Sequence, residues 1–503
     1  QSVAFAKGLR NHASVFGYSL ENEVFYIAAQ GRDIKPLQEE ITKMSQAVLE
    51  ADPTRPNMID GGRAMHTQTL PINCCHYDEV DARHYPDEAY LYELGPLPRR
   101  RKPPIDWSKP IYFGESYYTG GKKPEWFAGV GGEVCFTGII NCEDARSTFA
   151  TMLAEGYRWN GKISGWEFGS GDGKHNNSFQ PVAAFCRQWN TTFASGAEVP
   201  RLMKVFNDTR YDDPITVRWQ LAFDGTTVDE GEQTFELEPG TDEEFSLALQ
   251  MPETAERAEG QWIVTCHRKG AEVWRQVKDI SVINTDAAPR PGASPGEIVV
   301  WDPAGPVRTR LQESGIEFTA VDGITDLPED FRLLIVGPDA VDKETAGSEQ
   351  WRKLAAGNRR ILVLDQASPL AGKALPADVE LTDYVGRIGF SQDLGHPTFD
   401  GLKQKDFFTW SEDHVLYRNV YKKPTRGGKS LFQCDYGLEC TALLEVPVED
   451  GMMLLCQALV GTKLASDPVA QRWFDNMVNY ALAYELEARS VAVVAPQGSP
   501  KRM

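Results

Sequence analysis

Short apolar segments alternate with longer amphipathic segments over roughly the first 194 residues. The longer segments, residues 34–51 and 142–157, repeat apolar positions at the spacing of one helix face. The short segments have the length of buried strands, so the alternation predicts parallel βα units. The expected strands are residues 14–19, 57–60, 79–85, 110–115 and 162–168.

The hydrophobic period changes to two between about residues 200 and 284. Residues 215–223, 233–237 and 261–266 alternate apolar and polar side chains, and turns rich in Gly, Asp and Pro separate them. This pattern predicts a β-sandwich of roughly 85 residues.

A segment dense in proline and glycine, residues 287–296, marks a linker to another domain. Beyond it, segments with helical periodicity separate four strongly apolar runs, and the pattern of residues 468–485 predicts a final helix. Runs of this kind are typical of parallel strands buried on both faces, so we expect an open, doubly wound α/β sheet. The four runs are residues 297–301, 318–321, 333–336 and 360–364.

Composition narrows the range of functions. A chain of 503 residues with 41% hydrophobic residues can build several globular domains. Its formal net charge of -20 disfavours nucleic acid as a partner. No apolar run approaches the ~18 residues that cross a bilayer, so we expect no membrane segment. The nine cysteines form no CxxC pair and favour buried thiols, and His76 beside Cys74 and Cys75 lacks a second ligand pair, so no metal is expected.

Two acidic residues end apolar strands of the first region. Asn22 and Glu23 close the strand that begins near Ser14, and Glu115 closes the strand at 110–115. Parallel βα barrels keep their catalytic groups at the carboxyl ends of the strands. Two such carboxylates facing each other can divide the proton transfer and nucleophilic attack of glycoside hydrolysis. Glu21, two positions before Glu23, is expected to form an ion pair instead.

The string HASVFGYSLENE at 12–23 resembles the fourth barrel strand of clan A glycoside hydrolases, especially family 2 β-galactosidase-like enzymes. Four further landmarks follow in the family's order. Tyr18 and Ala13 stand where the family often has Trp and Pro, and both are outside the chemistry. The further landmarks are DPTRP at 52–56, DARHYP at 81–86, the strand 109–115, and GWEF at 165–168.

The resemblance implies a multidomain chain. Residues 1–198 would form strands 4–8 of a (β/α)8 TIM barrel, and residues 199–286 an immunoglobulin-like β-sandwich. After the linker, residues 297–490 resemble flavodoxin-like, glutamine amidotransferase-like α/β domains, including GHPTFDGL at 395–402, and residues 491–503 form a tail. Barrel strands 1–3 are expected to belong to a longer polypeptide or to come from elsewhere.

The same resemblance implies a retaining hydrolase of β-linked sugars, acting on a β-galactoside or related polysaccharide. Glu23 would be the general acid/base and Glu115 the nucleophile, with their carboxyl groups about 5 to 5.5 Å apart. The alternative is a catalytically inactive carbohydrate-binding or assembly protein built on a glycosidase barrel. The expected substrate-binding residues are Asn22, His84, Tyr85, Tyr117 and Trp166.

The resemblance gives three of these residues a role. Asn22 would hydrogen-bond the hydroxyl next to the anomeric carbon, Tyr85 would orient Glu115, and Trp166 would form an apolar floor for the sugar ring. The last domain lacks a cysteine after the strand at 362–369 and carries no GxGxxG, so it is interpreted as a scaffold or oligomerisation domain without a cofactor. A periplasmic or extracellular location is favoured, with the bacterial cytoplasm as the alternative.

Overall fold

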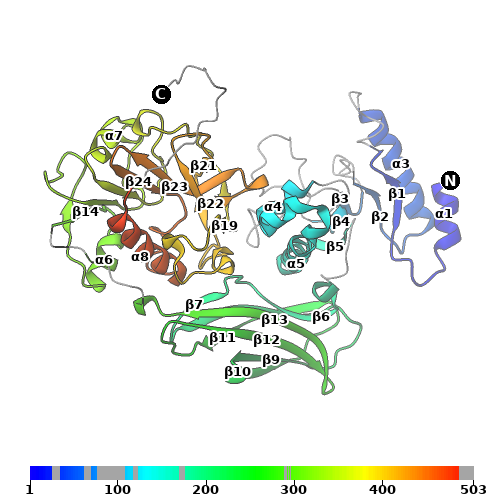
Figure 1. Cartoon of the computed structure of the whole chain (residues 1–503). Coiled ribbons are helices and arrows are strands. Elements are labelled where there is room, and N and C mark those ends of the chain that lie inside the picture. Colours follow the sequence, from blue (N-terminus) through cyan, green and yellow to red (C-terminus); the bar gives the residue numbers. More distant parts are fainter. Residues whose placement is uncertain are drawn as a thin grey trace, which may run out of the picture.

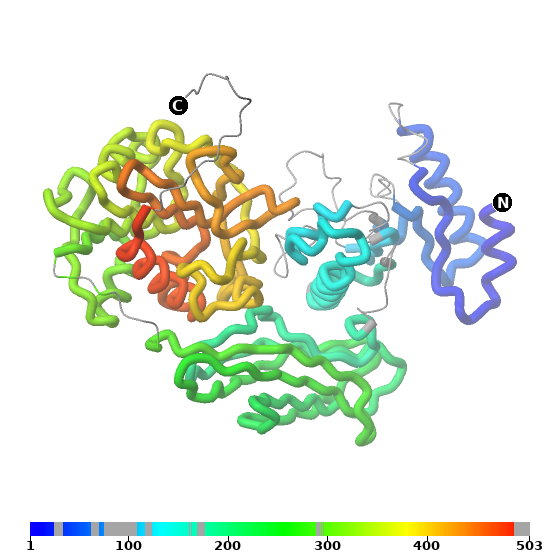
Figure 2. The backbone as a smooth tube through the Cα atoms, in the orientation of Figure 1, coloured from blue at the N-terminus to red at the C-terminus, as the bar shows by residue number. Residues whose placement is uncertain are grey.

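The computed structural model describes residues 1–24, 34–61, 70–75, 108–116, 123–161, 163–168, 176–287, 292, 294 and 296–486. The chain runs from an N-terminal part through a sandwich to a C-terminal part, and the sandwich lies beneath the other two in the view of Figures 1 and 2. The expected strand at 79–85, with His84 and Tyr85, lies outside the described residues, as does Tyr117.

Five strands of the N-terminal part run parallel to their neighbours. One sheet pairs β1 with β2, and the other has the order β3-β4-β5. Cys74 Sγ accepts the Gly61 N–H and lies 3.0 Å from Asp60 Oδ1, which connects the end of β2 to β3. Strands that are consecutive in the sequence are therefore neighbours in space. Their bounds are β1 (Tyr18–Asn22), β2 (Asn57–Asp60), β3 (Asn73–Cys75), β4 (Ile111–Ser116) and β5 (Ile163–Phe168).

Helices connect these strands as the apolar periodicity predicts. Helix α3 (Lys35–Ala51) lies between β1 and β2, and α5 (Glu143–Asn160) lies between β4 and β5. Gly161 ends α5 with a φ of 66°, the left-handed conformation in which glycine is favoured. The remaining helical segments are α1 (Ser2–Leu9), α4 (Pro124–Gly131), and the 3-10 turns η3 (Glu133–Thr137), η4 (Ile139–Cys142) and η5 (Asn176–Phe179).

Two sheets pack over a shared apolar core to form the sandwich. Their strand orders are β10-β9-β12-β13-β7 and β11-β8-β6. Strands β6 and β7 precede residue 199, where the sandwich was expected to begin, because Val182 and its neighbours pair with β8 and fill this core. The strands are β6 (Val182–Cys186), β7 (Thr192–Ala194), β8 (Glu198–Asn207), β9 (Ile215–Phe223), β10 (Thr226–Phe235), β11 (Thr241–Gln250), β12 (Arg257–Arg268) and β13 (Ala271–Ile283).

The C-terminal part is built on a sheet of order β15-β14-β16-β17-β24-β23-β22-β19. The first five strands are parallel, and successive side chains of β14 enter two different cores on the two faces. Helices α6 (Pro306–Glu313) and α8 (Pro468–Ala483) contribute to one core and α7 (Gln350–Ala355) to the other. The parallel strands are β14 (Ile298–Trp301), β15 (Thr319–Val321), β16 (Leu333–Val336), β17 (Arg360–Val363) and β24 (Gly451–Cys456).

An antiparallel extension continues this sheet beyond β24. Its strands are β23 (Cys440–Val448), β22 (Lys429–Cys434) and β19 (Gly389–Ser391), with β21 (Tyr421–Lys422) beside β23 and a separate pair β18 (Val385–Gly386) and β20 (Tyr417–Arg418). The 3-10 turns are η6 (Thr285–Ala287), η7 (Thr345–Gly347), η8 (Gly372–Ala374), η9 (Pro397–Phe399), η10 (Gln404–Phe407) and η11 (Tyr436–Leu438).

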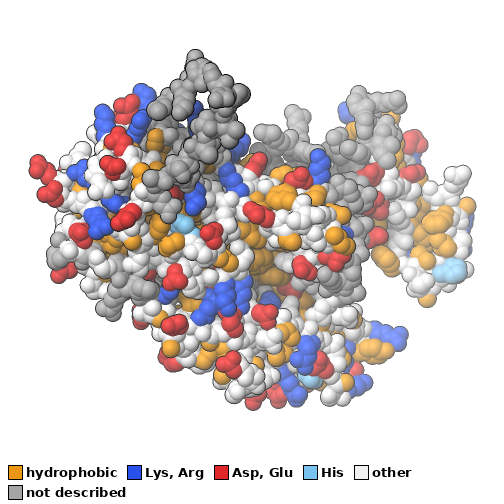
Figure 3. Space-filling view, viewed as in Figure 1, with side chains coloured by type: hydrophobic (Ala, Val, Ile, Leu, Met, Phe, Trp, Pro, Cys, Tyr) orange, Lys and Arg blue, Asp and Glu red, His pale blue; other side chains and the backbone are white. Residues whose placement is uncertain are grey.

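No helix among the described residues is both long enough and apolar enough to span a bilayer. Cationic and acidic side chains are interspersed over the face shown in Figure 3, without a broad surface of one sign.

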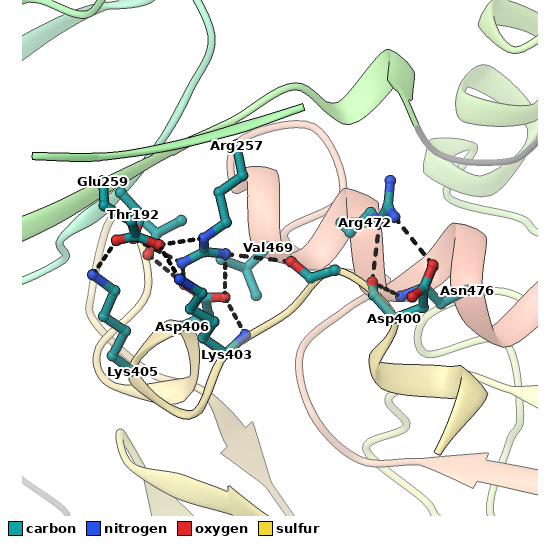
Figure 4. A network of polar contacts seen from close by, with 12 residues as sticks. Thr192, Arg257, Glu259, Asp400, Lys403, Lys405, Asp406, Val469, Arg472 and Asn476 are labelled. Atoms are coloured by element: carbon teal, nitrogen blue, oxygen red, sulfur yellow. Dashed lines mark hydrogen bonds and ion pairs between the residues drawn. The ribbon is translucent and has the colours of Figure 1, made fainter. Parts of the chain in front are cut away.

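A buried carboxylate joins the sandwich to the C-terminal part (Figure 4). Asp406 of η10 accepts hydrogen bonds from Arg257 Nη1 and Nη2 at 2.8 and 2.9 Å and from Thr192 Oγ1 at 2.9 Å. Beside it, Glu259 of β12 accepts from Lys403 Nζ at 2.7 Å and from Lys405 Nζ at 2.5 Å. A bidentate arginine–carboxylate pair removed from water is specific in geometry, so this junction fixes how the two parts meet.

We predict that Asp406→Asn lowers the free energy of unfolding by about 3 kcal/mol, because it removes the buried carboxylate that accepts from Arg257 Nη1 and Nη2 and leaves only the Glu259 contact at Nε. The matched control is Asp400→Asn. Asp400 also pairs with an arginine, but its side chain is 67% exposed whereas that of Asp406 is 0% exposed. The control should lose less than about 1 kcal/mol. Urea unfolding followed by tryptophan fluorescence measures both, and equal losses would contradict the junction's role.

The junction should also weaken in acid. Burial alone would raise the pKa of Glu259 above its ordinary 4.5, but Lys403, Lys405, Arg257 and Ser281 hold it well below that value. A carboxylate whose pKa is depressed by folding contributes stability above its unfolded pKa and loses it as the pH falls through the folded pKa. We therefore expect Glu259→Gln to be less stable than the unsubstituted chain at pH 7.

Urea unfolding of the two proteins from pH 7 to about pH 3 checks the sign of this effect. The difference in free energy of unfolding should shrink as the pH falls below about 4.5, the unfolded pKa. A difference that stays constant over this range would show that the Glu259 charge is not involved.

Candidate active site

Polar residues stand at the carboxyl ends of the parallel strands in the N-terminal part. Asn22 at the end of β1 is in register with Asp60 at the end of β2, and the Glu23 N–H donates to the Asp60 carbonyl at 2.8 Å. Glu115 lies near the end of β4, opposite Glu167 of β5. Because the strands within each sheet are parallel, Asn22 and Asp60 lie at the carboxyl end of one sheet and Glu115 and Glu167 at that of the other.

Glu23 is held in a sparsely populated backbone conformation. Its φ is 51°, and its residue is only 9% exposed although it carries a carboxylate. A non-glycine residue in the left-handed region costs on the order of 1 to 3 kcal/mol, and such residues cluster at functional sites. Asn22, by contrast, is exposed. The sequence singled out Glu23 by its position after an apolar run, and the structure adds burial and a left-handed backbone.

A bulge in β4 sets the position of Glu115. Phe113 lies opposite Trp166, but Glu115 lies opposite Glu167, so β4 has one extra residue at Gly114. Phe113 stacks on Tyr157 of α5 with ring centroids 5.0 Å apart. In an unbroken strand Glu115 would share that helix-covered face, because side chains two apart point the same way. The bulge breaks this alternation just before the half-buried Glu115.

Tyr112 of β4 interacts electrostatically with groups on β2, β3 and β5. Burial raises its pKa to about 12, and electrostatic interactions with Glu167, Asp60 and Cys74 act in the same direction. The phenol therefore keeps its proton at neutral pH and remains a hydrogen-bond donor. Sequence analysis missed Tyr112 and Asp60. The signal was present, because Asp60 ends the expected strand at 57–60 and Tyr112 lies three residues before Glu115.

Trp166 packs on the helix side of the sheet. Its ring contacts Tyr157 of α5 and Phe179 of η5, with centroids 5.5 and 5.6 Å apart. These contacts place Trp166 at the margin of the core that α4 and α5 cover. Its role as a floor for a sugar ring stays a prediction.

The described residues thus bring Asn22 and Glu23 to Asp60, and Glu115 to Glu167. The approach of Glu23 to Glu115 across the intervening strands stays a prediction. Within the described ranges no three histidine, cysteine or acidic side chains form a group that could hold a metal ion.

The carboxyl edge of the C-terminal sheet also carries acidic residues, which accept hydrogen bonds from backbone amides of the same domain. Asp302, after β14, accepts from the Val307 and Arg308 amides at the start of α6 at 2.9 and 3.1 Å. Asp365, after β17, accepts from the Gly461 and Thr462 amides at 2.8 and 3.2 Å, and burial raises its pKa. These bonds are structural, and oligomerisation through this domain stays a prediction.

No family model matches the chain, and no curated protein matches it. Among solved structures, the CARDB domain of a Pyrococcus furiosus protein is 12% identical, with 21% of this chain and 97% of that domain covered and a TM-score of 0.17. A β-glucosidase from Listeria innocua is 11% identical over 20% of this chain and 16% of its own, with a TM-score of 0.17. Spo0M, a sporulation control protein from Bacillus subtilis, is 17% identical over 20% of this chain and 48% of its own, with a TM-score of 0.15. These likenesses are too slight to indicate a fold or a function for this chain.

Proposed function

We propose that this chain is a retaining glycoside hydrolase that cleaves β-linked sugars with Glu23 as general acid/base and Glu115 as nucleophile. The observation that carries the proposal is the position of both glutamates at the carboxyl ends of parallel strands that follow one another in chain order. This is the edge at which parallel βα barrels keep their catalytic groups. The five ordered sequence landmarks support the same assignment.

In this mechanism the Glu115 carboxylate attacks the anomeric carbon while Glu23 protonates the departing glycosidic oxygen. A covalent glycosyl-enzyme forms, and Glu23 then takes a proton from the water that releases the sugar, so the anomeric configuration is retained. The Tyr112 phenol would supply a hydrogen bond at the same edge, since it stays protonated at neutral pH.

Hydrolysis of nitrophenyl β-glycosides by the full chain tests the proposal. We expect Glu115→Gln to reduce kcat by about 10³-fold or more, because the amide cannot form the glycosyl ester. Glu23→Gln should reduce turnover of unactivated β-linked disaccharides by roughly 10² to 10⁴-fold. It should affect the nitrophenyl substrates far less, because their leaving group departs without protonation.

Glu21→Gln is the matched control, since Glu21 lies on the same strand two positions before Glu23 and is exposed. It should retain nearly full turnover. A second readout is the anomer first released, which NMR identifies directly, and retention is expected. Turnover unchanged in Glu115→Gln, or an inverted product, would overturn the assignment of Glu115 as nucleophile.

A further inference from the structure

A cavity of about 1210 Å³ opens on the C-terminal part, within a different domain from the candidate active site. Its walls come from the segment around η9, the start of β22, the middle of β23 and the last turns of α8. Ligand sites typically occupy about 300 to 1,000 Å³, so this space can hold several linked rings. The side chains that define its chemistry are His396, Lys429, Glu445, Asn476, Tyr480 and Tyr484.

Glu445 gives the cavity a buried carboxylate. Its residue is only 6% exposed, and Oε2 accepts a hydrogen bond from the Tyr480 hydroxyl. Among the described residues nothing else bonds to this carboxylate, and the cationic neighbour directly across the strands, Lys429, forms no ion pair with it. A buried carboxylate is stabilised by further donors. A ligand hydroxyl in the cavity would supply one to Oε1.

His396 supplies a donor to the same cavity. Its Nδ1 accepts the Thr398 N–H at 3.3 Å and lies 2.9 Å from Thr398 Oγ1, and in the tautomer in which Nδ1 accepts from both groups Nε2 carries the ring proton. Burial and the charge of Lys429 lower the pKa of His396 below 6.5, so the ring is neutral at pH 7. It packs against the Tyr480 ring with centroids 4.6 Å apart.

Asn476 of α8 fixes the segment that carries His396. Its Nδ2 donates to the carbonyls of Thr398 and Asp400 at 3.3 and 2.8 Å, and Figure 4 shows it beside Asp400. Asn476, Tyr480 and Tyr484 follow one another at four-residue spacing and so lie on one side of the chain as α8 ends. The cavity is therefore lined by a built set of side chains rather than by a surface loop alone.

We infer that this cavity binds a neutral oligosaccharide. Sugar hydroxyls donate and accept at once, which fits a carboxylate, an amide, an imidazole N–H and a phenol, and the apolar faces of sugar rings pack on tyrosine. A phosphate-bearing ligand fits poorly, because Asp400, Glu445 and Glu485 outnumber Lys429 around the cavity. The site lies in a different domain from the proposed catalytic edge.

Isothermal titration calorimetry with cellotetraose, β-1,4-galactotetraose and xylotetraose tests this inference in the full chain carrying Glu115→Gln, which is not expected to hydrolyse the probes. We expect at least one probe to bind, and Glu445→Gln to weaken that binding by about ten-fold or more, as loss of a charged hydrogen-bond acceptor does. Tyr480→Phe, which removes only a hydroxyl, should weaken it several-fold. Glu449→Gln, an exposed glutamate that does not line the cavity, is the matched control and should bind like its parent.

Absence of binding by every probe at millimolar concentration would overturn the inference. Binding that is unchanged by both Glu445→Gln and Tyr480→Phe would also overturn it, because the saccharide would then occupy another site. Turnover of nitrophenyl glycosides, measured in the chain with an intact Glu115, tests the proposed hydrolysis independently of the proposed saccharide binding in the cavity. The exposed control Glu449→Gln should retain that turnover, and because hydrolysis and calorimetric binding are measured separately, loss of oligosaccharide binding and loss of hydrolysis are separate outcomes.

Discussion

The constraint that organises this protein is that parallel strands buried on their faces can place polar groups only at their ends. Leu333, Leu334, Ile335 and Val336 of β16 are each 0% exposed, so no polar side chain fits within that strand. The chain turns polar where such a strand stops, as at Asp302 after β14. Carboxylates therefore collect at the carboxyl ends of buried parallel strands before any function is considered.

The two edges differ in how those carboxylates are satisfied. In the C-terminal sheet, Asp302 accepts backbone amides from the helix that follows its strand, and Asp365 accepts them from Gly461 and Thr462, which follow β24. At the N-terminal edge, Glu115 faces Glu167 across a bulge, and Tyr112 lies near two acidic groups. The acidic residues of the N-terminal part are brought together by strand register rather than by amides of a following helix.

Sequence patterns located individual elements well where local periodicity decides them. The expected strand at 333–336 coincides with β16, and the expected helix at 468–485 begins with α8 at Pro468. The strand expected at 14–19 forms instead at Tyr18–Asn22, because its register with Asn57 begins at Tyr18 while Phe16 stays 76% exposed. Pairing with a distant strand determines which of the adjacent apolar residues begin the strand, and this pairing cannot be read from the local sequence.

Features that depend on distant residues could not be predicted in this way. The sequence of the apolar run Val182–Cys186 does not indicate whether it packs in the N-terminal part or in the sandwich. Its pairing with β8 places it in the core of the sandwich. Asp406 and Arg257 are 149 positions apart, so neither residue identified the other as its partner. The same holds for Glu445 and His396, which reach one cavity from a strand and a turn. A glutamate at the end of a strand can be recognised from the apolar residues just before it in the sequence. A binding cavity forms only when separate elements pack together. The sequence therefore indicated Glu23 and Glu115 but not Glu445.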